Sequence, residues 1–346
     1  MLRPMVTPSL VAEEPLTVRL RRQLGAAVID NAFHGLSRIG RLHPKLRAEQ
    51  ARIRVVRDIP YRHTGHPAHR LDVHIPEGKG PWPIVLYVHG GGFRILSKET
   101  HWVMALAFAR KGYLVVNIDY RLAPAHPFPA AIEDATHALR WTARHAHEYG
   151  GDPDRIVLAG ESAGANLVTS LAIATCYERP EPFARALFDE NIEPKAVVAA
   201  CGLHEVGNVE RFRKPNLPAW VFDRLVEVRM AYLDPSLHLA DREGGLDLAN
   251  PLHVLERGER PAKPLPPFFA SVGTADVLLD DTRRLAKALG ALGTRCEARY
   301  YPREPHAFQA FLWRERARDC WRHTHDFLRE ILAEPEPLAG SRSVKR

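Results

Sequence analysis

Apolar segments of strand length alternate with segments of helical periodicity through the central part of the chain. Mainly apolar runs occur at residues 84–89, 113–119, 154–159 and 196–201. Helical patterns occupy the stretches between them, at about 100–111, 129–147 and 163–176. Buried apolar strands that alternate with helices are typical of a mostly parallel sheet with helices on both faces, so the pattern predicts an α/β fold.

The pattern extends to both sides of this central part. Two short strands are predicted before it, at 52–60 and 70–76. After it come a strand at 268–272, a helix at 281–292, a strand at 297–301 and an amphipathic helix at about 308–332. Residues 204–250 hold a helical segment at 220–232 and no strand-like run. The predicted organisation is N-terminal cap helices at 1–50, an α/β domain at 51–203 and 251–335, a cap insertion at 204–250 and a frayed tail at 336–346.

Composition narrows the class of protein. The 346 residues are 45% hydrophobic, which is enough to bury a large core. The net charge is +7, but its 48 basic residues are scattered among 41 acidic ones, so the charge does not form a nucleic-acid-binding stripe. No apolar run approaches the roughly 18–20 residues of a membrane span, and the N-terminal residues lack the apolar core of a secretory signal. Four cysteines without a C-x-x-C pair indicate reduced thiols. We expect a cytoplasmic protein with no nucleic-acid partner and no stable membrane insertion.

The segment Gly160–Gly164, with the sequence GESAG, carries the strongest chemical signal. It follows a predicted strand and precedes a predicted helix, which is the context of a G-x-S-x-G nucleophile elbow. A serine in such an elbow stands on a strained turn, and small neighbours permit the tight approach of the backbone. The motif therefore predicts Ser162 as a nucleophile, with the N–H of Ala163 directed at developing negative charge.

A glycine-rich loop, His89–Gly92, directly follows the predicted strand at 84–89. Its three glycines expose consecutive backbone N–H groups that no side chain obstructs. Two such groups can donate hydrogen bonds to a tetrahedral oxyanion, and the N–H of Ala163 supplies a third. The loop is therefore a predicted oxyanion hole.

A serine nucleophile needs a base and an acid that orients the base, and in this fold both follow the serine at strand ends. Asp276 follows the predicted strand at 268–272, and His306 follows the one at 297–301. Asp280 and Asp281 compete for the role of the acid, although their position at the start of a predicted helix suits capping. The strand-end argument favours Asp276 as the acid and His306 as the base.

Taken in order, these motifs resemble the hormone-sensitive-lipase-like branch of α/β-hydrolase esterases, also called bacterial family IV carboxylesterases. The motifs are HGGG at 89–92, DYRLAP at 119–124, Pro-Phe-Pro at 127–129, GESAG at 160–164, D-x-L-x-D-D at 276–281 and H-x-F at 306–308. The match covers about residues 52–332 without the insertion. The resemblance implies an α/β-hydrolase fold and a triad of Ser162, His306 and Asp276. It also implies an oxyanion hole from Gly91, Gly92 and Ala163, with His89 supporting the glycine loop.

The resemblance further implies hydrolysis of short- to medium-chain acyl esters without a metal or organic cofactor, and a possible homodimer. The chain departs from the family pattern at Leu96, where a glycine is usual, and at Arg94, where an apolar residue is usual. Both lie near the predicted acyl or alcohol pocket, so the size and charge of the substrate stay open. Three alternatives also stay open: another acyl substrate (amide, lactone, carbamate or thioester), acyl transfer to an alcohol, and a non-catalytic ligand receptor on this fold.

Two other features look chemical but have simpler explanations. His63, His66 and His69 have a spacing that a zinc site could use, yet no carboxylate or cysteine lies at matching spacing, so a solvated hairpin loop is favoured. Asp119 and Arg121 are expected to hold the loop under the active site, because the predicted triad is already complete.

Overall fold

The computed structural model describes residues 52–215, 217–237 and 244–333. Its centre is a single sheet of eight strands, and the α/β fold predicted from the sequence is confirmed. The predicted cap helices at 1–50 and the predicted tail at 336–346 lie outside the described residues. The strands are β1 (Arg54–Pro60), β2 (Arg70–Ile75), β3 (Trp82–Val88), β4 (Leu114–Ile118), β5 (Gly151–Glu161), β6 (Ala196–Ala200), β7 (Phe268–Gly273) and β8 (Cys296–Tyr301).

The strand order is β1-β2-β4-β3-β5-β6-β7-β8. β2 pairs antiparallel with both β1 and β4, and every other neighbouring pair is parallel. The carboxyl ends of β3, β5, β6, β7 and β8 therefore lie at the same edge of the sheet. In open α/β sheets this edge carries the ligand site.

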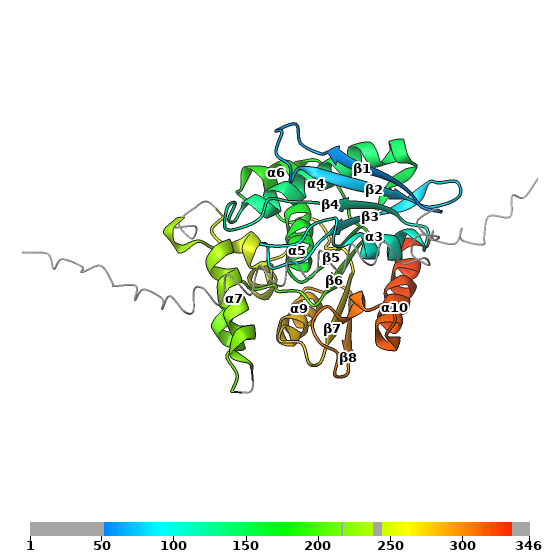
Figure 1. Ribbon diagram of the computed structural model, residues 1–346. Coiled ribbons are helices and arrows are strands. Elements are labelled where there is room, and N and C mark those ends of the chain that lie inside the picture. Colours follow the sequence, from blue (N-terminus) through cyan, green and yellow to red (C-terminus); the bar gives the residue numbers. More distant parts are fainter. Residues whose placement is uncertain (1–51, 216, 238–243, 334–346) are drawn as a thin grey trace, which may run out of the picture.

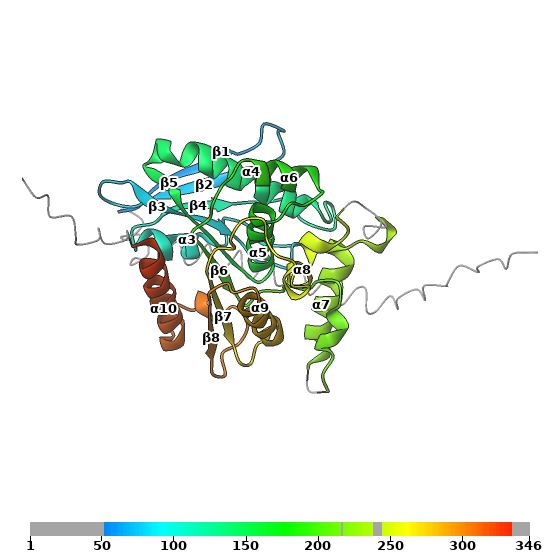
Figure 2. The same ribbon diagram turned by 180° about the vertical axis from the view of Figure 1, so that it is seen from behind.

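Helices cover both faces of the sheet (Figures 1 and 2). On one face, α3 (Trp102–Ala109) and α10 (Glu315–Leu332) pack against alternate strand residues such as Val85, Val157 and Phe269. The opposite face buries a larger cluster against α4 (Ala130–His145), α5 (Ala163–Cys176), α6 (Pro182–Asp189), α8 (Pro251–Glu256) and α9 (Leu279–Ala291). Apolar residues on both sides of each central strand explain the continuous apolar runs in the sequence. No helix in the described part of the chain is long and apolar enough to cross a membrane.

The last helix starts later than the sequence pattern predicts. The prediction places its start at about 308, whereas α10 begins at Glu315. Residues Phe308–Ala310 form a short 3₁₀ turn instead, after Ala307 in the left-handed backbone region. Phe308 is buried and packs against Tyr301 at the end of β8, so its apolar side chain belongs to the loop after the sheet and not to the helix. The short helices α6 and α8 were not predicted.

The described part of the predicted insertion contains α7 (Ala219–Tyr232), which lies beyond the sheet at the opposite side of the molecule from α10 (Figure 1). Its last residue, Tyr232, is buried and stacks on Phe93 with ring centroids 3.7 Å apart. Glu227 forms an ion pair of 2.5 Å with Arg94. Both partners lie in the loop after β3, so α7 packs directly on the glycine-rich loop.

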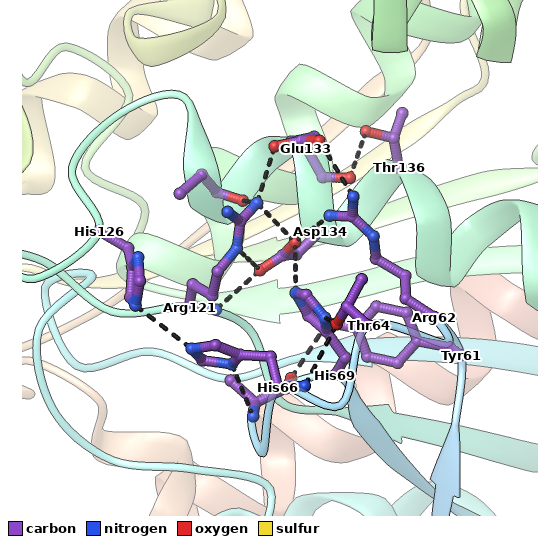
Figure 3. A network of polar contacts seen from close by, with 12 residues as sticks. Tyr61, Arg62, Thr64, His66, His69, Arg121, His126, Glu133, Asp134 and Thr136 are labelled. Atoms are coloured by element: carbon purple, nitrogen blue, oxygen red, sulfur yellow. Dashed lines mark hydrogen bonds and ion pairs between the residues drawn. The ribbon is translucent and has the colours of Figure 1, made fainter.

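A buried ionic network ties the turn between β1 and β2 to α4 (Figure 3). Asp134 of α4 is fully buried and accepts hydrogen bonds from the side chains of Arg62 (2.8 Å) and Arg121 (2.8 Å). Its carboxylate also lies 3.0 Å from Nε2 of His69. The expectation that Arg121 holds its loop is confirmed. The predicted solvated hairpin loop is confirmed at His63, which is exposed, but not at His69, which is buried and contacts Asp134, 65 positions later in the chain.

We predict that the substitution Asp134→Asn lowers the free energy of unfolding by about 1.5–3 kcal/mol, because it removes the buried carboxylate that Arg62 and Arg121 share and leaves them only the partly exposed Glu133. Urea unfolding followed by circular dichroism measures the change. The matched control is Asp189→Asn on α6, whose side chain is 57% exposed and pairs with the exposed Arg185 of the same helix. It should cost less than about 0.5 kcal/mol. Equal losses in the two variants would contradict the role assigned to the network.

Candidate active site

Five loops meet at the carboxyl edge of the sheet. The loop after β3 carries His89–Gly92, and the loop after β5 carries Ser162. Cys201 follows β6, Asp276 follows β7 and His306 follows β8. These positions are far apart in the sequence and become neighbours because their strands are parallel.

Ser162 stands at the sharp turn between β5 and α5. Its backbone has φ 53° and ψ −117°, a conformation that a non-glycine residue rarely adopts. The turn is fixed by hydrogen bonds, since Ser162 N–H donates to the carbonyl of Ala200 (2.9 Å) and its own carbonyl accepts from Asn166 N–H (3.2 Å). Such strain, on the order of 1–3 kcal/mol, is stored at functional sites. The geometry is that of a nucleophile elbow.

The glycine-rich loop is pressed against this elbow. A side chain at Gly164 would overlap the carbonyl oxygens of Val88 and His89, so only glycine lets α5 approach the end of β3 this closely. Gly91 has φ 110°, and a Cβ there would overlap the carbonyl of Ile95. The two motifs predicted separately from the sequence are therefore held backbone to backbone.

His89 is buried and neutral. Burial, together with the neighbouring His101, lowers its pKa to about 3. Its Nδ1 donates to the carbonyl of Gly90 (2.7 Å), and its ring stacks on Tyr120 at 4.2 Å. Tyr120 in turn donates its hydroxyl hydrogen to the His89 carbonyl (2.9 Å). These contacts fix the start of the glycine loop.

Asp276 and His306 are joined by a hydrogen bond of 2.8 Å between Oδ2 and Nδ1. The Asp276 side chain is fully buried, and its other oxygen accepts from the N–H of Leu278 (2.9 Å). Desolvation opposes protonation of His306, but the negative charge of Asp276 and the neighbouring Cys201 outweigh it and raise the pKa of His306 well above its usual value. The imidazole is 41% exposed and can meet a ligand from solvent.

The competing acids have other partners. Asp281 is fully buried and accepts hydrogen bonds from Arg211 and from the backbone N–H of His204 (2.9 Å). Asp280 is half-exposed and pairs with Lys214 at 2.9 Å. Within the described residues, only Asp276 of these three contacts His306.

Ser162 and His306 follow β5 and β8 at the same edge of the sheet, but within the described residues no hydrogen bond joins the serine hydroxyl to the imidazole. Such bonds are often long in ligand-free enzymes and tighten when a substrate binds. The neighbour of His306 that the sequence analysis missed is Cys201, which follows β6. Its sulfur lies within 4.8 Å of the ligand atoms of Asp276 and His306. No motif marks this position, because a lone cysteine after a strand has no distinctive spacing.

Glu161, beside the serine, faces inward rather than toward solvent. It accepts hydrogen bonds from His101 Nε2 (2.9 Å) and Gln309 Nε2 (2.8 Å). Burial alone would raise the pKa of its carboxyl, but the hydrogen bond and charge of His101 lower it. The carboxylate therefore links the elbow to α3 and to the loop that carries His306. His101 and Gln309 were not predicted.

Two groups of side chains in the described part of the chain bring metal-ligand atoms within 4.8 Å of one another. One consists of Asp58, Asp72 and Glu99, and the ammonium group of Lys98 already lies 2.8–2.9 Å from each of these carboxylates. The other consists of Cys201, Asp276 and His306. An acidic group, an imidazole paired with it, a strained serine and a nearby row of glycine N–H groups are together suited to acyl transfer.

Comparisons with known proteins agree with this chemistry. Residues 85–310 match the family model described as alpha/beta hydrolase fold. The chain is 31% identical over 274 residues to the carboxylesterase NlhH of Mycobacterium tuberculosis, with 78% of each chain covered. It is 30% identical over 223 residues to an acetyl esterase of Salmonella dublin, with 64% of each chain covered. The crystal structure of an esterase from the bacterial hormone-sensitive lipase (HSL) family is similar with a TM-score of 0.68 and 26% identity, over 91% of this chain and 97% of the other.

Proposed function

The chain belongs to the hormone-sensitive-lipase-like (family IV) carboxylesterases of the α/β-hydrolase fold, and from this premise we propose that it hydrolyses short- to medium-chain acyl esters with Ser162, His306 and Asp276 as its triad. The observation that carries the proposal is the 2.8 Å bond between buried Asp276 and His306, at the same edge of the sheet as the strained Ser162.

In the first half of the reaction, the Ser162 hydroxyl attacks the ester carbonyl while His306 takes its proton. Asp276 accepts from Nδ1 of the imidazole, which leaves Nε2 as the proton acceptor, and its negative charge stabilises the imidazolium that forms. The N–H groups of Gly91, Gly92 and Ala163 would bind the oxyanion. Each donor of this kind contributes about 3–4 kcal/mol to the transition state.

In the second half, His306 gives the proton to the departing alcohol, and the acyl group stays on Ser162. Water then attacks the acyl-enzyme with His306 as its base, and the acid leaves. Every step uses proton transfers between groups of this chain, the ester and water.

Two side chains near the glycine-rich loop favour a substrate with a small acyl group. Val228 of α7 would meet a Cβ placed on Gly92, and Leu96 would meet one placed on Gly91, so both occupy space beside the oxyanion loop. Arg94 does not present a free positive charge, because it pairs with Glu227 at 2.5 Å. The similarity to an acetyl esterase points in the same direction.

The direct test combines a substrate series with active-site labelling. p-Nitrophenyl esters from acetate to palmitate should be hydrolysed fastest at the short end. An organophosphate should label the protein once, and peptide mapping should place the label on Ser162. A maximum at palmitate would contradict the proposed acyl size. Labelling at another residue, or none, would contradict the proposed nucleophile.

The pH dependence of kcat/KM gives a separate prediction. Only neutral His306 can accept the proton, and the charge of Asp276 raises the pKa of that imidazole well above its usual value. Activity should therefore rise with pH through a midpoint clearly above about 6.5, the pKa of an unperturbed histidine. Stopped or continuous assays with p-nitrophenyl acetate between pH 5 and pH 10 locate the midpoint. A midpoint at or below 6.5 would show that Asp276 does not act on the base.

A further inference from the structure

Cys201 has no part in the proposed reaction, yet its thiol lies beside the proposed acid and base. Its sulfur, a carboxylate oxygen of Asp276 and a ring nitrogen of His306 all lie within 4.8 Å of one another. The backbone holds the thiol in place, since Cys201 N–H donates to the carbonyl of Ser271 (2.6 Å) and φ is 40°. Gln309 Nε2 is 3.9 Å from the sulfur.

Sulfur, imidazole nitrogen and carboxylate oxygen together form the ligand set of a borderline-soft divalent cation. Zinc binds these three atoms at about 2.0–2.3 Å in tetrahedral sites, which places ligand atoms about 3.4–3.6 Å from one another. The present separations are within small side-chain movements of that value. Hard cations such as Mg²⁺ prefer all-oxygen sites and would not select this one.

The surroundings also suit a cation. Cys201 and the Asp276 side chain are buried, whereas His306 is 41% exposed, so an ion can enter from the side of the imidazole. Three protein ligands leave a fourth position for water, as in other open zinc sites. Binding releases the thiol proton of Cys201 to solvent, because the thiolate is the ligand. The coordinating nitrogen of His306 gives up its hydrogen as well, since only a ring nitrogen with a free lone pair can bind the ion.

We propose that Cys201, Asp276 and His306 form an inhibitory site for thiophilic divalent cations such as Zn²⁺ and Cd²⁺. This inference rests on the proposed function, since the ion would occupy the base and the acid of the triad. An imidazole bound to a metal cannot take the proton of Ser162, so the cation stops ester hydrolysis reversibly.

The test measures binding and activity separately on the full-length protein. Titration with CdCl₂ should produce the ultraviolet absorption band of a cadmium–thiolate bond, and this band should saturate at one Cd²⁺ per protein. Calorimetric titration with ZnCl₂ should show one binding site. Ser162→Ala should bind like the wild type, because it keeps all three ligands. Cys201→Ser should weaken binding at least about tenfold. Loss of a residue that only supports a metal ligand already has an effect of that size, and Cys201 would itself be a ligand. Cys176→Ser is the matched control, since Cys176 is also a buried free thiol but lies at the far end of α5.

In the activity arm, Zn²⁺ should inhibit the wild type and Cys176→Ser equally, and Cys201→Ser should need at least about ten times more Zn²⁺ for the same fractional inhibition. EDTA should restore activity, and Mg²⁺ should have no effect. Absence of the cadmium band in the wild type, or equal zinc affinity in the Cys201→Ser and Cys176→Ser variants, would overturn the proposal. Failure of the proposed function would look different, because an inactive protein would still bind cadmium through Cys201.

Discussion

Replacing Ser162 with alanine should lower kcat for p-nitrophenyl acetate on the order of 10⁶-fold. Without the hydroxyl no acyl-enzyme forms, and water must attack the ester directly. Residual turnover then comes only from substrate binding and the oxyanion hole, which give roughly 10³–10⁴-fold over the reaction in water. Initial rates with purified protein measure the loss, and mass spectrometry after organophosphate treatment should find no label.

The matched control is Ser170→Ala. Ser170 lies on the same helix, α5, and is also buried, but its hydroxyl donates to the carbonyl of Leu248 (2.8 Å). This variant should lose about 1 kcal/mol of stability and keep kcat within a few-fold of the wild type. Substantial turnover by Ser162→Ala, in protein freed of contaminating esterase, would show that another group is the nucleophile.

The second large effect is expected for Asp276→Asn, which should lower kcat about 10⁴-fold. The amide keeps the size of the side chain but removes the negative charge. It no longer stabilises the imidazolium, and its N–H₂ group can hold the imidazole in the wrong tautomer. Initial rates at several pH values measure the effect, because the acid limb of the activity profile should also move toward lower pH as the pKa of His306 falls.

Two neighbouring aspartates supply the controls. Asp280→Asn should leave kcat nearly unchanged, because Asp280 pairs with Lys214 on the surface. Asp281→Asn should reduce stability more than it changes the chemistry, since Asp281 binds Arg211 and the backbone of His204 in the interior. If Asp280→Asn were the variant that lost activity, the assignment of the acid would be wrong.

The hydrophobic pattern was sufficient to predict each of the eight strands. The central strands are apolar along their whole length because they are buried on both faces, whereas the edge strands β1 and β8 are partly exposed and mix polar with apolar residues. The pattern was less informative where an apolar residue packs in a loop. Phe308 fits the period of the helix that follows, but it is buried against Tyr301, and α10 starts only at Glu315. Periodicity cannot distinguish these two ways of burying one side chain.

The sequence by itself determined the features that depend on neighbouring residues. The GESAG turn and the HGGG loop need small residues at fixed places, and local order reveals both. Only the tertiary structure decided which distant groups meet. It separated Asp280 and Asp281 from His306, buried His69 against Asp134, and brought Cys201 to His306 and Asp276. These contacts arise where parallel strands end at one edge or where a loop folds onto a helix. Burial and charge stabilise these contacts. They join segments that are far apart in the sequence, so no local periodicity reveals them.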